Sequence, residues 1–256
     1  MTFLLVELFL ALTGFLMTFV LFYRFPKLPL EANVSSFPRV SVVIPARNEE
    51  INLPRLLTAL KNQNVSPFEI LVVDDASQDR TAEIARSFGV RLLTPPEKPE
   101  GWVGKCWACQ FGAEHALGEL LLFLDADVDL APDGLSRLMA AYEKEQSALS
   151  VQPYHLPKKA YEQLSLFFNL VQVAANGSAL RTPVSLGLYG PVILIPRARY
   201  ASIGGHKRIR GNILEDMAFG ELLRQTNVPY RLFIGDGGLS FRMYPEGFRS
   251  LLQGWT

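Results

Sequence analysis

Residues 70–77 read ILVVDDAS and residues 120–127 read LLLFLDAD, so two apolar runs of strand length each end in aspartates. A third short apolar run, Val40 to Ile44, precedes them. Runs of this kind are typical of strands buried on both faces of a parallel sheet. In such sheets, ligands bind where the carboxyl ends of the strands meet. The pattern therefore predicts a sheet whose ligand-binding edge is acidic.

Segments typical of helices separate these strands through the first half of the chain. Asn48 can cap a helix with Glu49 and Glu50 in its first turn, where acidic side chains favour the positive end of the helix dipole. Further helices are expected from Ser77 or Asp79 to about Phe88, over Gly104–Leu117 and over Pro132–Lys144, with strands over Phe68–Val73 and Val90–Leu93. This alternation predicts an α/β domain whose mostly parallel sheet carries helices on both faces.

The second half of the chain is less regular, and fewer elements can be predicted there. We expect a helix over Tyr161–Leu180, a strand over Val192–Ile195 and a helix over Leu214–Gln225. Within the first of these, Leu164, Phe167, Phe168 and Val171 form an apolar helical stripe. Core packing is the favoured interpretation of the stripe, and a helix resting on a membrane surface is the alternative.

The N-terminal segment is apolar enough to be a membrane anchor. Residues 3–23 read FLLVELFLALTGFLMTFVLFY, and Glu7 is their only ionisable side chain. About 20 helical residues span a bilayer core of ~30 Å. The basic residues Arg24, Lys27 and Arg39 follow the run, which predicts a cytoplasmic domain on the inner cell membrane. A cleaved signal peptide and a buried core helix are the alternatives. We expect an anchor over residues 1–25, a linker over 26–38 and a folded domain over 39–256.

Composition excludes some classes of partner and site. The chain has 25 basic and 25 acidic residues, so no excess of positive charge indicates a nucleic-acid partner. Its two cysteines, Cys106 and Cys109, are too few for a disulfide framework, which fits a reducing compartment. Structural zinc needs about four ligands and no second such pair exists. We interpret both thiols as packing groups.

The strand-end aspartates indicate a cation site. Asp125 and Asp127 lie two residues apart just beyond a predicted strand, and Asp74 and Asp75 follow another. Carboxylates so placed can converge on one hard cation, which prefers oxygen ligands and leaves positions open for phosphate oxygens. Strand-end aspartates can also simply end strands and cap helices. Two acidic strand ends in one sheet favour the ligand-binding interpretation.

Four motifs in order resemble glycosyltransferase family 2. They are Pro45-Ala46-Arg47-Asn48-Glu49, Val73-Asp74-Asp75-Ala76-Ser77, Asp125-Ala126-Asp127 and Glu215-Asp216. The resemblance runs from about Val40 to the end of the chain and implies the nucleotide-diphospho-sugar transferase fold called GT-A. Residues 101–109, GWVGKCWAC, are similar to bacterial membrane members associated with carotenoid and hopanoid pathways.

The resemblance implies a donor site for a nucleotide sugar, most simply a UDP-sugar. Matching positions assign Pro45, Arg47, Glu49 and Asp75 to the uracil and ribose pocket. Ala46, Asp74 and Ala126 belong to the same donor motifs. Asp127 would bind Mg²⁺ or Mn²⁺, and Asp125 would help through the ribose or the metal shell. Lys105 could reach the diphosphate, with a solvated lysine at a helix start as the alternative.

The resemblance also implies a single inverting displacement, which requires a base for the acceptor hydroxyl. Asp216 is the candidate base and Glu215 lies beside it on the acceptor side, although both could be ordinary acids of a helix N-terminus. His206 precedes Lys207, Arg208 and Arg210. This basic group would hold donor phosphate or an anionic acceptor, and a solvated loop is an equal alternative.

The acceptor is expected to be lipid-like, such as a carotenoid acid, a hopanoid or a polyprenyl carrier. Residues 251–256 read LLQGWT, which lacks the QxxRW pattern of processive family members and argues against polymer synthesis. The sequence stops where relatives continue into further transmembrane helices, so a truncated chain is one expectation. Two other functions remain open: a nucleotidyltransferase of similar fold, and a membrane-tethered protein that binds sugar nucleotide without catalysis.

Overall fold

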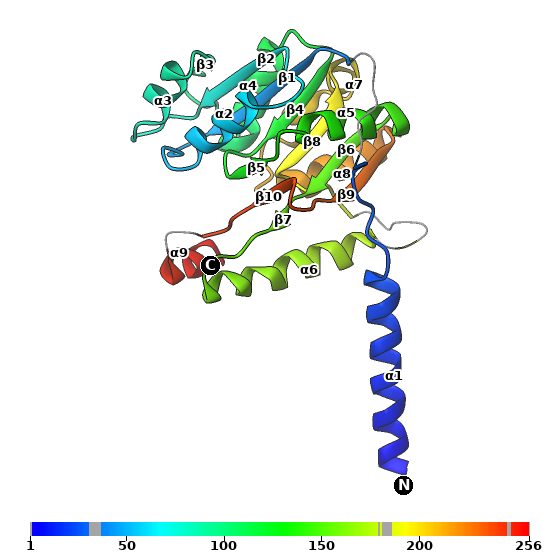
Figure 1. Ribbon diagram of the computed structural model, residues 1–256. Coiled ribbons are helices and arrows are strands. Elements are labelled where there is room, and N and C mark those ends of the chain that lie inside the picture. Colours follow the sequence, from blue (N-terminus) through cyan, green and yellow to red (C-terminus); the bar gives the residue numbers. More distant parts are fainter. Residues whose placement is uncertain (1, 31–36, 179, 181–185, 245–246, 256) are drawn as a thin grey trace.

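The computed structural model in Figure 1 describes residues 2–30, 37–178, 180, 186–244 and 247–255. Its centre is a seven-stranded sheet with the order β3-β2-β1-β4-β8-β6-β9. The strands are β1 (Val40–Ala46), β2 (Glu69–Asp74), β3 (Arg91–Leu93), β4 (Leu120–Leu124), β6 (Ala148–Gln152), β8 (Val192–Pro196) and β9 (Tyr230–Ile234). β3, β2, β1 and β4 are parallel neighbours, whereas β8 runs antiparallel to both β4 and β6. The mostly parallel sheet is confirmed.

Helices cover both faces of this sheet because alternate side chains of each strand point to opposite sides. Val42 and Ile44 of β1 pack in one core, and Val43 packs in the other. The first core includes α2 (Leu53–Lys61), α3 (Thr81–Ser87) and α5 (Gly134–Glu145). The second includes α4 (Gly104–His115), α7 (Arg197–Ser202), η2 (Gly205–Ile209) and α8 (Glu215–Gln225).

A small second sheet forms at the edge of the domain. It has the order β5-β10-β7, from β5 (Val128–Leu130), β10 (Leu239–Phe241) and β7 (Tyr154–His155). Near it lie η1 (Ala160–Leu164), α6 (Ser165–Asn176) and α9 (Phe248–Trp255). α6 runs across the underside of the domain in Figure 1, and α9 lies at one of its ends.

The start of α2 corrects one sequence-based expectation. Asn48 does not cap this helix, which begins at Leu53 with a proline in its first turn. Asn48 instead adopts a left-handed conformation with φ of 58°, which asparagine tolerates better than most residues. Glu49 and Glu50 therefore lie in the loop. Neither of the two caps proposed for the next helix is its N-cap residue, which is Arg80. Asp79 accepts a hydrogen bond from the Thr81 amide at 3.0 Å, and Ser77 accepts one from the Asn48 amide.

The apolar stripe of α6 also differs from the favoured interpretation. Phe167 is 66% exposed and Phe168 is 45% exposed, and Leu164 and Val171 are exposed to a similar degree. The prediction that the stripe packs in the core was therefore wrong. Only Ser165, Val173 and Asn176 of this helix are buried.

α1 (Thr2–Phe22) projects from the same side of the domain on which α6 lies. Among the described residues, Phe3–Phe22 is the one helix long and apolar enough to cross a membrane, and no part of it is buried. The chain after α1 is fixed to the domain. The Ile234 amide donates to the Pro26 carbonyl at 2.8 Å, and Arg137 donates to the Pro29 carbonyl at 2.7 Å.

Candidate functional site

A cavity of about 420 Å³ lies at the carboxyl ends of β1, β2 and β4, where the sequence predicts the ligand-binding edge. These strands are parallel neighbours, so the loops that follow them converge on one place. The cavity is lined by Pro45, Ala46, Arg47, Glu49, Asp75, Gly104, Lys105, Ala108, Asp125, Ala126 and Asp127. The structure thus gathers most of the predicted donor residues around one space.

Two loops at this edge are held in uncommon backbone conformations. Asn48, after β1, and Ala76, after β2, have φ values of 58° and 56°. A non-glycine residue there costs of the order of 1 kcal/mol, which must be offset by surrounding contacts. The Asn48 amide donates to Ser77 Oγ at 3.0 Å, and the Gln78 amide donates to Asn48 Oδ1 at 2.8 Å. These reciprocal bonds lock the two loops together beside the cavity.

Arg47 and Asp75 face each other across the cavity wall. Arg47 Nη1 lies 3.6 Å from Asp75 Oδ2, and the Asp75 side chain is mostly sheltered. Gly104 begins α4 directly against this carboxylate. A Cβ atom at Gly104 would lie 2.3 Å from Asp75 Oδ2, so no other residue fits without displacing it. The sequence predicted Gly104 at the start of a helix, but it did not reveal that a side chain at this position would collide with Asp75.

Asp125 and Asp127 follow β4 and line the cavity. Burial and the charges of Asp125 and Glu49 raise the pKa of Asp127 to about 7. Crowded carboxylates of this kind bind a cation well, because a cation would relieve their repulsion. Among the described residues, no three His, Cys, Asp or Glu side chains form a complete metal site. An ion held here would need further ligands from a bound molecule.

Lys105 connects the cavity to α8. Its Nζ atom lies 2.9 Å from Asp125 Oδ1 and 2.8 Å from Glu215 Oε1. Burial opposes the positive charge, but the Asp125 and Glu215 carboxylates raise the pKa of Lys105 well above its ordinary value. The lysine therefore bridges the Asp125 carboxylate after β4 and the first turn of α8, with 33% of its side chain exposed.

Asp216 lies next to Glu215, largely enclosed by protein. Its Oδ1 atom accepts a hydrogen bond from the Met217 amide at 2.8 Å, and Gln172 Nε2 of α6 lies 3.4 Å from Oδ2. Burial and the neighbouring charge of Glu215 raise the pKa of Asp216. A carboxylate with a raised pKa accepts protons more readily near neutral pH. Gln172 was missed from the sequence, because nothing in a helical stripe marks which polar residue faces a distant carboxylate.

Besides Glu215 and Asp216 of α8, two predicted residues do not line the cavity, Asp74 and His206. Asp74 is buried, and its Oδ1 atom accepts a hydrogen bond from the Ser77 amide at 3.1 Å, so it supports the loop after β2. His206 is also buried. Its ring stacks on Phe219 at 4.9 Å, and its Nδ1 atom lies 2.8 Å from Tyr200 Oη. Burial and the charge of Lys105 lower the pKa of His206 to about 3, so the imidazole is neutral.

The two cysteines pack as expected from the sequence. Cys106 and Cys109 are buried free thiols in α4, and burial raises the pKa of Cys106 to about 11. The Cys106 thiol faces the Ile209 and Asn212 carbonyls at 3.7 and 3.8 Å. It therefore contributes to the contact between α4 and the segment that carries η2. The exposed side chains of Lys207, Arg208 and Arg210 lie on this segment.

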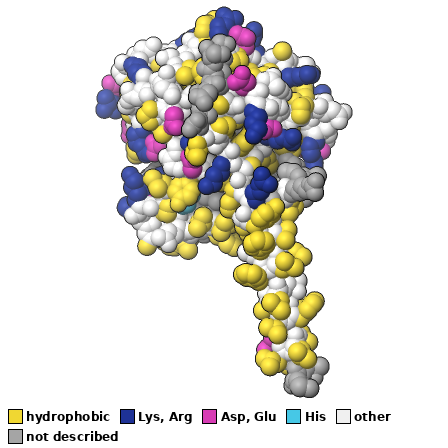
Figure 2. All heavy atoms as spheres, turned by 45° about the vertical axis from the view of Figure 1, so that its right-hand side comes forward, with side chains coloured by type: hydrophobic (Ala, Val, Ile, Leu, Met, Phe, Trp, Pro, Cys, Tyr) yellow, Lys and Arg dark blue, Asp and Glu magenta, His cyan; other side chains and the backbone are white. Residues whose placement is uncertain are grey.

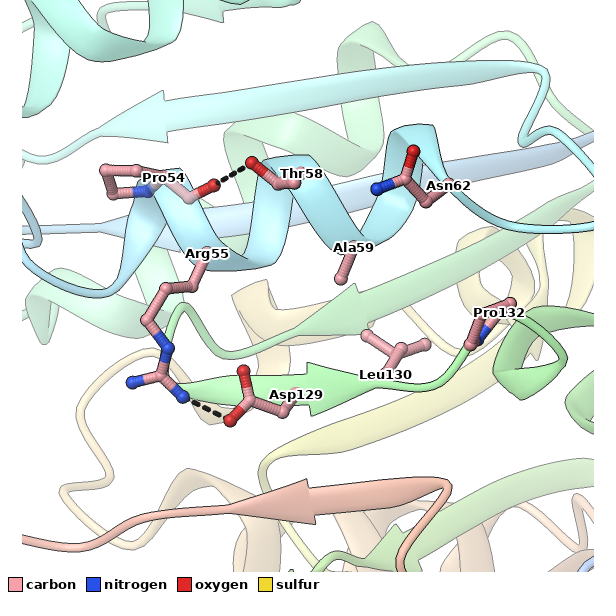
Figure 3. Close-up of a pocket in the computed structure, with 8 residues that line it drawn as sticks. All are labelled: Pro54, Arg55, Thr58, Ala59, Asn62, Asp129, Leu130 and Pro132. Carbon is pink, nitrogen blue, oxygen red and sulfur yellow. Dashed lines mark hydrogen bonds and ion pairs between the residues drawn. The ribbon is translucent and has the colours of Figure 1, made fainter.

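Figure 3 shows a second cavity, whose volume is about 540 Å³. It lies between α2 and β5, and its most polar feature is the ion pair between Arg55 and Asp129. The remaining lining residues are Pro54, Thr58, Ala59, Asn62, Leu130 and Pro132. The two charged groups satisfy each other, so this cavity offers a ligand little unpaired chemistry. The candidate site is the cavity at the strand ends.

Known proteins resemble most of this chain. Residues 41–176 match the family model described as glycosyl transferase family 2. A 4,4'-diaponeurosporenoate glycosyltransferase from Staphylococcus haemolyticus is 39% identical over 225 residues, which cover 85% of this chain and 60% of that protein. The protein of the same name from Staphylococcus aureus is 38% identical over 226 residues, with the same coverage. The chain thus spans about 60% of the length of these relatives.

Solved structures show the same fold. A mannosyltransferase from Pyrobaculum calidifontis, in complex with GDP-mannose and Mn²⁺, has a TM-score of 0.63 at 20% identity, covering 94% of this chain and 66% of that one. A fragment of S. aureus TarS in complex with UDP has a TM-score of 0.57 at 19% identity, covering 84% of this chain and 63% of that one. The predicted GT-A fold is confirmed.

Proposed function

Because the chain belongs to glycosyltransferase family 2, we propose that it moves a sugar from a nucleotide donor to a lipid-like acceptor with inversion at the anomeric carbon. The observation that carries this proposal is the Lys105 ammonium, which joins the strand-end cavity to Glu215 beside Asp216. A donor site and a candidate base therefore adjoin each other. The names of the staphylococcal relatives support a carotenoid-type acceptor.

The donor would lie in the cavity at the strand ends. Arg47, Glu49 and Asp75 supply polar groups around Pro45 and Ala46, a combination suited to a nucleobase and ribose. Lys105 would contact the diphosphate, which carries the negative charge that its ammonium can pair with. The UDP and GDP-mannose bound to the structural neighbours support a nucleoside diphosphate in this place, and we favour UDP.

Asp127 and Asp125 would hold a divalent cation, Mg²⁺ or Mn²⁺. The crowding that raises the pKa of Asp127 to about 7 fits such an ion, and the Mn²⁺ of the Pyrobaculum neighbour supports it. When bound, the metal would supply positive charge to the leaving diphosphate. Lys105 would add a second positive charge on the α8 side of the same group.

Asp216 would act as the general base. The acceptor O–H proton passes to an Asp216 carboxylate oxygen while the acceptor oxygen forms a bond to the anomeric carbon. The bond from that carbon to the diphosphate oxygen breaks, and the nucleoside diphosphate leaves with the electron pair. The Met217 amide fixes one carboxylate oxygen and Gln172 lies beside the other, so the group is oriented before an acceptor arrives.

The surroundings of Asp216 suit an apolar acceptor. Ile213 and Leu214 immediately precede the acidic pair and are 81% and 68% exposed. These side chains could cover an aliphatic chain close to the base. The N-terminal helix would hold the enzyme at the cytoplasmic face of the membrane, where such an acceptor resides.

The test is product analysis with the full chain reconstituted in phospholipid nanodiscs. UDP- and GDP-sugars are offered one at a time with Mg²⁺ or Mn²⁺ and a carotenoid carboxylic acid, and the lipid extract is analysed by mass spectrometry. We expect one donor to give an acceptor heavier by one glycosyl residue, with equimolar release of nucleoside diphosphate.

Three other results would contradict the proposal. Formation of nucleotide sugar from sugar phosphate and nucleoside triphosphate would indicate a nucleotidyltransferase. Donor binding without turnover on any lipid acceptor, including total lipid extract, would indicate a binding protein. A product whose anomeric configuration is retained, as determined by NMR, would exclude a mechanism with a single displacement.

A further inference from the structure

The outer face of α6 is an unusual surface for a folded domain. Its twelve residues, SLFFNLVQVAAN, include no ionisable side chain, and Leu166, Phe167, Phe168, Leu170 and Val171 are each more than 40% exposed. By contrast, α5 and α8, which have similar lengths, carry charged residues on their exposed sides. Large exposed apolar patches mark places where another phase or partner binds.

Neighbouring elements extend this patch. Phe248 and Leu252 of α9 are exposed, as are Leu156 and Leu164 near η1. α9 is held beside η1, because the Phe248 ring packs edge-on against Tyr161 with ring centroids 6.4 Å apart. We call the combined surface the apolar underside; its residues are Leu156, Leu164, Leu166, Phe167, Phe168, Leu170, Val171, Phe248 and Leu252.

Three of the four polar side chains of α6, those of Asn169, Gln172 and Asn176, are hydrogen-bonded within the domain. Asn176 Oδ1 accepts the Gly187 amide at 3.0 Å, and Asn169 Oδ1 accepts Gln152 Nε2 at 3.3 Å. Gln172 lies against Asp216. One face of α6 is therefore hydrogen-bonded to the domain, including Asp216, and the opposite face is apolar and exposed.

The apolar underside adjoins the membrane helix. Figure 1 shows α1 leaving the domain on the side where α6 and α9 lie, and Figure 2 shows apolar side chains continuing from α1 onto the adjoining face of the domain. The bonds from Ile234 to Pro26 and from Arg137 to Pro29 fix the segment between α1 and the domain. If α1 enters a bilayer, the apolar underside must meet the surface of that bilayer.

The charges around this surface favour an anionic bilayer. Arg24 and Lys27 follow α1, Lys158 and Lys159 precede η1, and Arg249 lies in α9; all are exposed. Over residues 154–176 and 247–252 the one acidic residue is Glu162, whose carboxylate is buried and bonded to Arg242. Basic groups beside an apolar helix face are attracted to anionic lipid headgroups.

We propose that α6 and α9 lie in the interfacial layer of the same bilayer that α1 enters, with the apolar underside among the upper acyl chains. α6 then separates the bilayer from Asp216, and an acceptor embedded in the membrane reaches the base around this helix. The position of α6 is independent of the enzymatic activity, whereas the acceptor route rests on the proposed function.

The position of α6 is tested with fluorescent probes on the full chain in nanodiscs that contain anionic phospholipid. Because Cys106 and Cys109 are buried, a thiol-reactive bimane will label the introduced sites of Phe167→Cys and Val171→Cys. Leu117→Cys is the matched control, since Leu117 is also apolar and 59% exposed but lies before β4, at the opposite edge of the sheet from Asp125. Quenching is measured with lipid-borne nitroxide and with aqueous iodide.

We expect the labels at positions 167 and 171 to be quenched by the nitroxide lipid and to be several-fold less sensitive to iodide than the label at position 117. Equal iodide sensitivity at positions 167 and 117 would overturn the proposal, because α6 would then face water. Protection from both quenchers would also overturn it, because α6 would then be covered by protein, such as a second copy of the chain.

The acceptor route has a separate test. Phe167→Asp should raise the KM for a membrane-embedded acceptor several-fold in nanodiscs, while a short-chain, water-soluble acceptor is used as by the unaltered chain; Leu117→Asp should change neither. Equal effects on both acceptors would contradict the route. Absence of transfer in the unaltered chain would refute the proposed function, and the quenching result would still decide where α6 lies.

Discussion

The sheet has two parts that contribute different groups to the candidate site. The first part is formed by β1 to β4, and the second by β6, β8 and β9. In the first part, the parallel strands β1, β2 and β4 are largely buried and each ends in a polar loop, and residues of those loops line the cavity. In the second part, β8 runs antiparallel between β4 and β6. The later helix α8 places Glu215 against Lys105 of the cavity, and the earlier helix α6 places Gln172 beside Asp216.

Under the proposed function, this difference separates donor binding from catalysis. The first part holds groups suited to a nucleotide and a cation, and they come from consecutive units of one repeating pattern. The second part supplies one carboxylate whose pKa is raised by burial and by Glu215. Lys105 contacts both parts, through Asp125 and Glu215. Substitutions in the two parts should therefore alter different kinetic constants.

The largest effect should come from Asp216→Asn. The amide keeps the shape of the side chain but cannot accept the acceptor proton, so kcat should fall about 10²- to 10⁴-fold with donor affinity nearly unchanged. Glu221→Gln is the matched control, since Glu221 lies on the same helix and pairs with Arg224 at the surface. Steady-state kinetics give kcat, and calorimetry with nucleoside diphosphate gives the affinity of the donor site. Near-normal turnover in Asp216→Asn would move the base elsewhere, with Glu215 the first residue to test.

The next effect is on folding rather than on the reaction. The Glu162 carboxylate is fully buried against Arg242 and also accepts the Lys158 amide at 2.6 Å. Removing one member of a buried pair costs about 3–5 kcal/mol, because the remaining charge is left without a partner. In Glu162→Gln, the thermal midpoint should fall by about 6–20 °C, which tryptophan fluorescence in nanodiscs can measure.

The same pair predicts a pH dependence. Hydrogen bonds from Arg242 lower the pKa of Glu162 from 4.5 to about 2. A lowered pKa in the folded state means that the stabilisation is complete above about 4.5 and is lost as pH falls from there toward 2. The difference between the unaltered chain and Glu162→Gln should therefore shrink over that range. Glu145→Gln, which breaks a partly exposed pair with Arg231, should cost far less at any pH.

A smaller effect is expected on the binding side. Asp127→Asn removes the charge that would pair with the cation, and donor affinity in Mg²⁺ or Mn²⁺ should weaken by at least about tenfold, since even loss of an outer partner typically lowers metal affinity about 10- to 100-fold. Asp129→Asn is the matched control, because Asp129 lies two residues further along and pairs with Arg55 outside the cavity. Calorimetry with and without metal measures the donor affinity of both variants. An unchanged metal-dependent affinity would remove Asp127 from the cation site.

Sequence predicted the first part of the sheet well because its signals are local. The run at residues 120–124 is a strand with the expected bounds, and the predicted cavity residues lie within a few positions of strand ends. The beginning of α2 was misplaced because the left-handed Asn48 is fixed by Ser77 and Gln78, which belong to another loop. Such a contact between distant segments leaves no mark in either segment alone.

The second part was harder for the same reason. β6 and β9 pair with each other across some 80 residues, and β8 reverses direction between β4 and β6, neither of which follows from strand propensity. An apolar stripe such as that of α6 has the same pattern whether it packs in a core or stays exposed. The Lys105–Glu215 contact likewise depends on how α4 and α8 pack.

The smallest effect concerns Cys106, at the contact between the two parts. Burial raises the pKa of its thiol from 9.0 to about 11, so the thiolate fraction at neutral pH falls about 100-fold. Alkylation of the folded chain by iodoacetamide should therefore be slow, and it should become rapid for both cysteines after unfolding. Intact-mass spectrometry over time measures the two rates.

Because the Cys106 thiol faces the Ile209 and Asn212 carbonyls, fast labelling at one site in the folded chain would mean that the segment with η2 opens away from α4. Lys105 would then lose its fixed place between the two parts, and the division between a binding side and a reactive side would depend on closure of that segment.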